Sequence, residues 1–283
     1  MERMVPDGVN APQIEYWNGP AGDRWARSAD TQDVMIGNLG AAALDACQIQ
    51  LGHAILDIGC GSGSTTLEIA RRTGDTGIVV GIDISAPMLE VANKRLGGAG
   101  LSNVRFENRD AATHCFEKTY FDRVYSRFGV MFFVDPVPAF QNIRSAVKPD
   151  GRLAFVCWQA RTDNQWMELP FGIALRHVAP PPPALPGEPG PTAFANPDRV
   201  RRILSESNFG DIQIEPLAMP IMLGGDIPTA VERLSQLGPT GRLLRDASED
   251  VKAAIAADLA KELRAFLTGD GVKMKGSAWV VTA

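Results

Sequence analysis

The sequence predicts an α/β fold: a doubly wound, seven-stranded, mostly parallel sheet with an α-helical cap formed by insertions. Short apolar runs alternate with amphipathic helical stretches along most of the 283 residues, as in βαβ units. The first apolar run leads into a glycine-rich loop, residues 59–63, and then into a helix. Acidic or hydroxyl residues follow several of the runs. Right-handed crossovers bring the carboxyl ends of parallel strands to one edge of the sheet, where such folds bind ligands.

The predicted elements follow one another in a regular order. A helix over about residues 30–47 carries an apolar face and precedes the first strand. Short apolar runs predict strands at 54–58, 77–83, 103–107, 121–126, 152–158, 209–222 and 278–281. The intervening helices are predicted to begin near Ser64, Ser85, Pro136 and Asn196, with Ser85 as an N-cap.

Two helical insertions interrupt this pattern. Residues 159–195 include a short helix near 169–177 and the run APPPPALPGEPGP, which fits either a stiff linker or the edge of a substrate lid. The second insertion, 227–272, is mostly helical, and its residues Asp246 and Glu249 resemble a capping box. We therefore expect a core of residues 51–158, 196–226 and 273–283, with an N-terminal helical segment, 1–50, over the ligand site.

Composition and charge narrow the classes of partner. The formal net charge is -5 and no basic run stands out, which disfavours nucleic acid. The four cysteines are scattered without CxxC spacing, so we expect no metal site and a reduced, cytoplasmic compartment. No apolar run is long enough to span a membrane, and the first ten residues lack the apolar core of a signal peptide. We expect a small-molecule substrate and leave monomer and homodimer open.

The stretch AILDIGCGSGSTTLEIA, residues 54–70, carries the most specific signal. Asp57 precedes Gly59, Gly61 and Gly63, and the predicted helix follows directly. Because glycine has no Cβ, the backbone can turn tightly and a ligand can lie against it. The amides at the helix start attract an anionic or polar group, and Asp57 attracts a cation. The stretch therefore suits a zwitterionic ligand.

Polar side chains also end three other predicted strands. Asp83, Asp110 and Ser126 fall at or just past strand ends, as Asp57 does. An isolated acid at a strand end is more often a solvated loop residue, but acids at several equivalent ends favour a binding site. A carboxylate there can accept charge-assisted hydrogen bonds from two vicinal hydroxyls.

Four motifs, DIGCGSGS, GIDIS, NRDAA and FDRVYSRFGVMFF, in this order resemble the class I S-adenosylmethionine-dependent methyltransferase family of the small-molecule type. The resemblance covers about residues 50–160, and the final strand more loosely. The acidic-x-Gly-x-Gly-x-Gly pattern is complete at Asp57, Gly59, Gly61 and Gly63. The resemblance implies a Rossmann-like core, S-adenosylmethionine as the cofactor and S-adenosylhomocysteine as the product.

The resemblance also implies a role for each motif. Asp57 and Gly59 would face the methionine arm of the cofactor, and Asp83 would accept hydrogen bonds from both ribose hydroxyls. The remaining cofactor-binding residues would lie against the adenine or near the sulfonium; they are Ile84, Met88, Asp110, Ala111 and Ser126.

The sequence predicts the methyl acceptor less directly than it predicts the cofactor. Phe128 and Met131 indicate an apolar acceptor site, and the motif there lacks the Asn/Asp-Pro-Pro-Tyr of nucleic-acid N-methyltransferases. Trp17 and Trp25 could fold over the cofactor and the acceptor, or pack as part of an ordinary N-terminal helix. His177, in the first insertion, is the candidate general base. Transfer to oxygen is favoured, with carbon and nitrogen left open.

Two other functions stay open. An NAD(P)-dependent oxidoreductase uses the same strand, loop and helix, but its G-x-G-x-x-G fingerprint requires glycine where this chain has Ser64. The carboxylate of Asp57 would also lie near the pyrophosphate of the dinucleotide and repel it. The third possibility is a catalytically silent protein that binds a cofactor or a partner. Binding of S-adenosylhomocysteine or of NAD discriminates between the first two.

Overall fold

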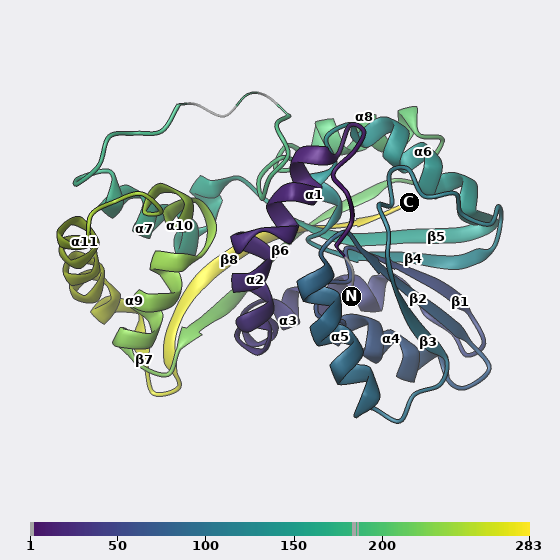
Figure 1. The fold of residues 1–283 in the computed structure, drawn as a ribbon, viewed down its shortest axis with the longest axis horizontal. Helices are drawn as coiled ribbons and strands as arrows, with labels where there is room; N and C mark the ends of the chain where they lie inside the picture. Colours follow the sequence, from purple (N-terminus) through teal and green to yellow (C-terminus); the bar gives the residue numbers. More distant parts are fainter. Residues whose placement is uncertain (1–2, 183–184, 186) are drawn as a thin grey trace.

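One sheet forms the centre of the computed structural model, which describes residues 3–182, 185 and 187–283 (Figure 1). Its strand order is β3-β2-β1-β4-β5-β8-β6, with β7 paired to β8. The strands are β1 (Ala54–Ile58), β2 (Ile78–Asp83), β3 (Val104–Asn108), β4 (Phe121–Arg127), β5 (Val147–Trp158), β6 (Gln213–Gly224), β7 (Leu267–Thr268) and β8 (Gly271–Thr282). The predicted α/β, mostly parallel architecture is confirmed.

Strands β1 to β5 pair in parallel, whereas β8 pairs antiparallel with both β5 and β6. The strand order reverses between β1 and β4, which opens a crevice at their carboxyl ends. Among the described residues, the sheet has eight strands in place of the predicted seven. The additional strand, β7, has only two residues and pairs with the start of β8, so no periodicity in the sequence could reveal it.

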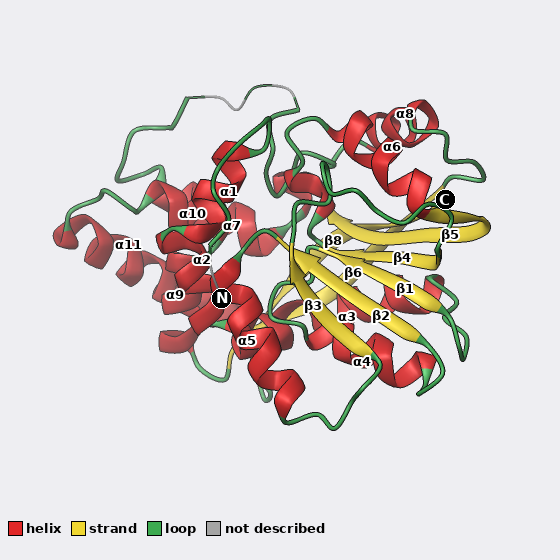
Figure 2. Ribbon diagram, turned by 45° about the vertical axis from the view of Figure 1, so that its right-hand side comes forward, coloured by secondary structure: helices red, strands yellow, loops and turns green. Residues whose placement is uncertain are grey.

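Helices cover both faces of the sheet (Figure 2). Helices α3 and α4 lie on one face, and α6 and α8 lie on the other. The helices of the core are α3 (Ala29–Ala46), α4 (Ser64–Thr73), α5 (Ala86–Gly97), α6 (Pro136–Ala146) and α8 (Pro197–Glu206), with a 3-10 turn, η1 (Val130–Phe132).

Two further helices, α1 (Ala11–Asn18) and α2 (Pro20–Arg27), precede α3. Gly19 separates them in an extended conformation, and Pro20 occupies the first turn of α2, where its missing N–H costs nothing. The buried Asn18 side chain donates to the carbonyl of Ile84 at 2.8 Å and accepts from the amide of Ala86 at 3.0 Å. These bonds fix the N-terminal helices against the start of α5.

The cap is built from α7 (Gln165–Ala174), α9 (Ile227–Gln236), α10 (Gly238–Leu243), α11 (Glu249–Glu262) and two 3-10 turns, η2 (Arg161–Asp163) and η3 (Leu263–Phe266). It has a small core of its own that includes Ile173, Leu244 and Leu259. Strands β6 and β8 extend beyond the main sheet and reach the cap (Figure 1).

Two predicted helix caps differ from the structure. Ser85 stands at the N-cap position of α5, but its hydroxyl makes no capping bond and donates to the carbonyl of Trp17 at 2.8 Å. The N-cap of α11 is Ser248, which accepts from the amide of Val251, so Asp246 and Glu249 form no capping box. Helix α7 also begins at Gln165, four residues before the predicted start.

The proline-rich run at 179–191 includes residues 183, 184 and 186, which lie outside the described residues, so neither interpretation of the run is tested. Within the described part of the chain, no helix is both long enough and apolar enough to cross a membrane. The same part of the chain holds no cluster of three or more His, Cys, Asp or Glu side chains that could bind a metal ion.

Candidate functional site

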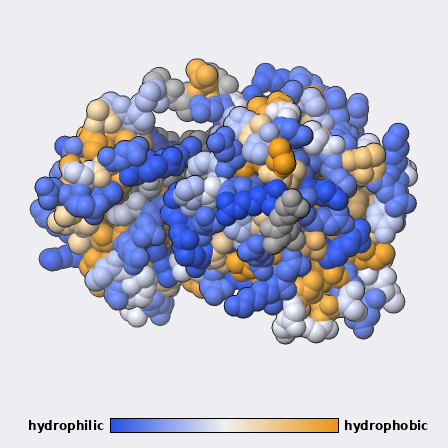
Figure 3. Space-filling model, in the orientation of Figure 1, coloured by the Kyte–Doolittle hydropathy of each residue, from blue (hydrophilic) through white to orange (hydrophobic). Residues whose placement is uncertain are grey.

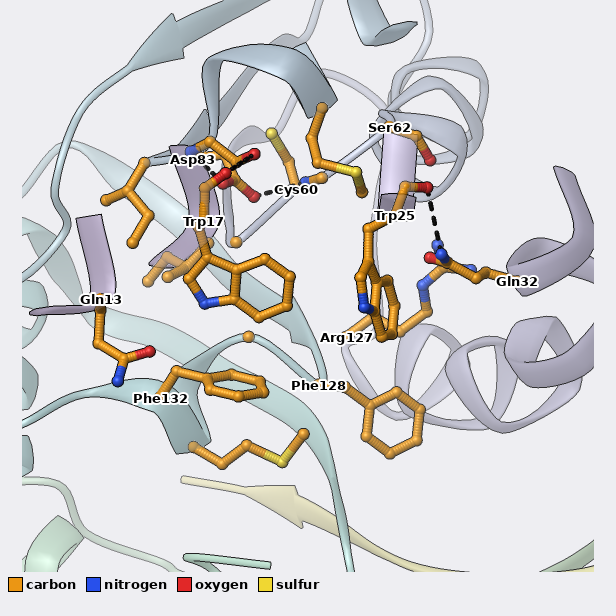
Figure 4. Close-up of a pocket in the computed structure, with 18 of the residues that line it drawn as sticks. Gln13, Trp17, Trp25, Gln32, Cys60, Ser62, Asp83, Arg127, Phe128 and Phe132 are labelled. Carbon is orange, nitrogen blue, oxygen red and sulfur yellow. Dashed lines mark hydrogen bonds between the residues drawn. The ribbon is translucent and has the colours of Figure 1, made fainter. Parts of the chain in front are cut away.

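A large pocket lies at the carboxyl ends of β1, β2 and β4, between the N-terminal helices and the cap (Figure 4). It encloses about 1490 Å³ of space, part of which is open to solvent. Polar groups from the glycine loop and strand ends line one part, and aromatic rings line another. The lining residues predicted from the sequence are Trp17, Trp25, Asp57, Gly59, Gly61, Asp83, Ile84, Met88, Asp110, Ala111, Phe128 and Met131.

The glycine loop between β1 and α4 requires glycine at two lining positions. Gly59 and Gly61 adopt φ values of 65° and 53°, which other residues rarely adopt. A Cβ on Gly59 would lie 2.9 Å from the Cα of Gly129. The loop after β4 can therefore approach closely only because Gly59 has no side chain.

Gly63 differs from the other two glycines because it does not line the pocket. A Cβ there would lie 2.6 Å from the ring of Phe106 and 2.8 Å from Ala92. Gly63 therefore allows α4 to pack against its neighbours, and its predicted contact with the cofactor is corrected to a packing role. Gly63 is the N-cap residue of α4 and has a φ of 78°, which favours glycine.

Asp83 ends β2 and binds the glycine loop. One carboxylate oxygen accepts from the amide of Gly61 and the other from the amide of Ser85, both at 2.8 Å. Burial raises the pKa of Asp83, and these two hydrogen bonds oppose that rise. The carboxylate is thus fixed in orientation at the pocket wall.

Asp110 follows β3 and is held by a residue 100 positions earlier. The amide group of Asn10 donates to both carboxylate oxygens, at 3.0 and 2.9 Å, and the backbone of Ala112 donates to Oδ1 at 2.9 Å. Asn10 is itself buried and lines the pocket. Nothing in the sequence near Asn10 signals this pairing.

Asp57 is the most deeply buried of the three acids, because only 1% of its surface is exposed. The Thr66 hydroxyl donates to it at 2.6 Å. Burial raises the pKa of Asp57 to about 7, although Thr66 and the charge of Arg127 lower it and Asp83 raises it. The carboxyl group therefore titrates near neutral pH.

Arg127, at the end of β4, places a guanidinium on the pocket wall. Its Nη2 contacts Asp33 at 2.7 Å and the hydroxyl of Ser64 at 3.1 Å. Burial alone would raise the pKa of Asp33, but Arg127 and Ser64 hold it below its usual value. The Nε and Nη1 groups of Arg127 have no partner among the described residues, so they remain available as donors.

Aromatic rings form the other part of the pocket. Trp17 makes edge-to-face contacts with Trp25 and Phe132, at centroid distances of 5.7 and 5.2 Å. Phe128 stacks on Trp158 at 4.2 Å. Figure 4 shows the indoles of Trp17 and Trp25 and the rings of Phe128 and Phe132 around one space. We call this part the aromatic chamber; Trp166 of the cap also lines the pocket.

Two predicted site residues lie elsewhere. The Ser126 side chain is fully buried and donates to the carbonyl of Ile58 at 2.8 Å, so it joins β4 to β1 and does not line the pocket. His177 lies in the cap, where Nε2 contacts Asp258 at 2.8 Å. It is not among the residues that line the pocket, so its prediction as the base is corrected to a hydrogen-bond partner of Asp258 within the cap.

Several lining residues were missed by the sequence reasoning. They include Asn10, Gln13, Gln32, Arg127, Trp158 and Trp166. Arg127 belongs to the quoted motif after the fourth strand, so its position offered a signal. Of the others, Asn10 and Gln13 lie at the start of α1, Gln32 lies in α3, Trp158 ends β5 and Trp166 belongs to α7. Their sequences show only ordinary helix or strand patterns.

Comparison with protein families and curated proteins matches the same region. Residues 55–151 match the model of a family described as a methyltransferase domain. Aklanonic acid methyltransferase DauC of Streptomyces sp. (strain C5) is 35% identical over 117 residues, 41% of this chain and 53% of that protein. Ubiquinone/menaquinone biosynthesis C-methyltransferase UbiE of Coxiella burnetii is 34% identical over 110 residues, 38% of this chain and 44% of that protein. The chain spans about half the length of these two relatives.

A third relative aligns over more of the chain. The nocamycin O-methyltransferase of Saccharothrix syringae is 28% identical over 236 residues, which cover 80% of this chain and 83% of that protein.

Solved structures share the fold. The YcgJ protein of Bacillus subtilis has a TM-score of 0.56 at 19% identity and covers 86% of this chain and 95% of its own. Phosphoethanolamine N-methyltransferase 2 of Haemonchus contortus, in complex with phosphomonomethylethanolamine and S-adenosylhomocysteine, has a TM-score of 0.59 at 20% identity. That match covers 94% of this chain and 58% of the other.

Proposed function

We propose, because residues 55–151 match a methyltransferase-domain family, that this protein transfers a methyl group from S-adenosylmethionine to a small organic molecule. One observation carries the proposal: Asp57, Asp83 and Asp110 come from the ends of successive strands and line one pocket with the glycine loop. An adenosine joined to an amino acid presents a cation, two vicinal hydroxyls and an exocyclic amine, one for each acid.

The hydrogen-bonding capacity of the acids fits this ligand. A carboxylate has about four acceptor positions. Asp83 uses one on each oxygen for backbone amides, which leaves one on each oxygen for the two ribose hydroxyls. Asp110 uses two positions on Oδ1 and one on Oδ2, which leaves one for a single N–H of the adenine amine.

The methionine arm has matching groups near the glycine loop. Asp57 has three acceptor positions left beside its bond from Thr66, so it can accept from an ammonium group. Gln32 donates to the carbonyl of Trp25 and to the hydroxyl of Ser28, and its Oε1 has no hydrogen-bond partner among the described residues. The unused donors of Arg127 suit the carboxylate end.

The aromatic chamber favours an acceptor with a flat apolar body, because rings stack or pack edge-to-face on such surfaces. Methylation on oxygen fits best. The relative that aligns over 80% of this chain is named an O-methyltransferase, UbiE is named a C-methyltransferase, and the name of DauC states no acceptor atom.

Bound at this site, S-adenosylmethionine supplies a methyl group on a sulfonium that is already a strong electrophile. The residues of the chain therefore contribute mainly position and exclusion of water. Trp17, Phe132 and Phe128 would hold the acceptor against the glycine-loop side of the pocket, and the two N-terminal helices would cover it.

The test is methyl transfer from labelled S-adenosylmethionine to a mixture of small metabolites, followed by chemical identification of the labelled product. We expect one labelled product with the methyl on oxygen. A product with the methyl on carbon would correct the choice of atom and leave the activity standing. Binding of the donor without any labelled product would support the silent cofactor-binding protein.

A further inference from the structure

A second, smaller pocket lies between α2 and the cap helix α10 and shares a wall with the main pocket. Trp25, Leu237 and Gly238 line both pockets. The two spaces therefore adjoin at these three residues. The side chains on the remaining wall of this second space decide what it can bind.

That wall is strongly basic. Arg24 comes from α2, and Arg242 and Arg245 come from α10 and the residues after it. We call this space the arginine pocket. The phenol of Tyr16 also lines it, and no carboxylate does. The molecule as a whole carries a formal net charge of -5, so this gathering of positive charge is local.

The three guanidinium groups have no ion-pair or hydrogen-bond partner among the described residues. The acid next to Arg24 in the sequence, Asp23, is contacted instead by Arg3 at 3.2 Å. In the main pocket, by comparison, Arg127 is paired with Asp33. All three arginines are exposed, so water and salt weaken their mutual repulsion, and an anionic ligand that contacts them removes the rest.

A purely structural role explains less of the arrangement. Arg24 and Arg242 lie in the last turns of their helices, where a cation interacts favourably with the helix dipole. That effect acts on each helix separately. It does not require arginines from two segments more than 200 positions apart to line one space, and Arg245 lies beyond the end of α10.

We propose that the arginine pocket binds an anionic group, a carboxylate or a phosphate, on the methyl acceptor. The guanidinium groups donate charge-assisted hydrogen bonds to that group, and the acceptor's apolar body lies in the aromatic chamber. This inference rests on the proposed function, since it identifies a chemical feature of the acceptor. It predicts that the enzyme selects anionic over neutral acceptors of the same shape.

Calorimetry on the protein loaded with S-adenosylhomocysteine tests the proposal with three probes of similar shape: 2-naphthoate, 2-naphthyl phosphate and the neutral 2-naphthamide. We expect at least one anion to bind about tenfold or more tightly than the amide. The tighter of the two anions identifies the group. Equal affinities, or no binding of any probe, would overturn the proposal.

Variants distinguish anion binding in the arginine pocket from a general effect of the protein's positive charges. The double variant Arg242→Gln/Arg245→Gln should reduce the anions to the affinity of 2-naphthamide while S-adenosylhomocysteine binds as before. Arg264→Gln, an exposed arginine of η3 that does not line either pocket, should keep the preference. A preference that survives in the double variant would contradict the proposal.

The same experiments distinguish a failure of the proposed function from a failure of this proposal. If S-adenosylhomocysteine does not bind, the methyltransferase proposal fails. The three probes are then titrated against the ligand-free protein, and the anion preference and its loss in the double variant still decide whether the arginine pocket binds anions.

Discussion

Asp57 has a buried carboxyl group without an ion-pair partner in the described part of the chain. Burial raises its pKa to about 7. Because this pKa lies above that of an exposed aspartate, the folded state holds the proton more tightly than the unfolded state does. Asp57 therefore lowers the free energy of unfolding as pH rises from about 4 to about 7. A ligand ammonium beside Asp57 would favour the ionised form and reverse that cost.

The affinity for S-adenosylhomocysteine should accordingly depend on pH. We expect affinity to rise between pH 6 and 8, by at most about tenfold per pH unit, and to level off above the pKa of Asp57. In Asp57→Asn the dependence should flatten, and the ligand-free variant should unfold at a higher temperature than the natural protein at pH 8. Calorimetry and thermal unfolding at several pH values check both. An unchanged pH profile in Asp57→Asn would remove Asp57 from the methionine arm.

Phe128 is held at a φ of 58°, an uncommon conformation for a bulky residue, and stacks on Trp158. Phe128→Leu keeps an apolar side chain but loses the stack, which is worth about 0.5–1.5 kcal/mol. We expect KM for the acceptor to rise by about 2–10-fold, with unchanged affinity for S-adenosylhomocysteine.

The matched control for that variant is Phe116→Leu, which removes a ring that contacts His114 and Phe121 outside the pocket. Its KM should stay at the value of the natural protein. A KM shift of equal size in both variants would show that the Phe128 effect is a general loss of packing.

At the residue scale, the sequence predicted correctly the acidic side chains at strand ends that line the pocket. It did not predict which residues serve internal packing instead. Asp83 was predictable because a strand ends at it. Gly63 and Ser126 matched the motifs, yet neither lines the pocket. Gly63 allows close packing against β3 and α5, and Ser126 donates to the backbone of β1. Asn10 could not be found, because its partner Asp110 is brought to it only by the fold.

Among the elements, one buried asparagine links the cap to the sheet through two hydrogen bonds. The Asn164 side chain donates to the carbonyl of Ser277 at 3.0 Å and accepts from its amide at 2.7 Å. Asn164 precedes α7, and Ser277 lies in β8, so these two bonds tie the first cap helix to the strand that leads out of the sheet.

Asn164→Ala should leave the amide and carbonyl of Ser277 buried without this partner. We expect a loss of about 1–3 kcal/mol in the free energy of unfolding, measured by urea denaturation. Asn38→Ala, at an exposed position of α3, is the control and should change stability by less than about 0.5 kcal/mol. Equal stability of the two variants would mean that the cap does not depend on this connection.

Elements with strong periodicity were predicted within a few residues, and the others were not. Strands β1 to β4 are short apolar runs and match their predicted ranges closely. Strand β8 spans Gly271–Thr282, but only its last part was predicted. Residues 271–277 read GVKMKGS, and their lysines and glycines interrupt the apolar run where the strand leaves the sheet. The separation of α1 from α2 depends on a single extended glycine, Gly19.

The whole molecule forms the pocket from three separate regions of the chain: the N-terminal helices, the ends of the core strands and the cap. Figure 3 shows mostly hydrophilic atoms in the middle of the view, where α2 lies, with hydrophobic areas to either side. The sequence alone could not show that Trp17, Phe132 and Trp166 share one space.

Titration calorimetry with S-adenosylhomocysteine and with NAD tests the central claim most directly. We expect S-adenosylhomocysteine to bind at one site per chain and NAD not to bind. Asp83→Ala should weaken the binding by about 1–3 kcal/mol, whereas Asp75→Ala, an exposed acid in the turn before β2, should not. Binding of NAD without binding of S-adenosylhomocysteine would contradict the account.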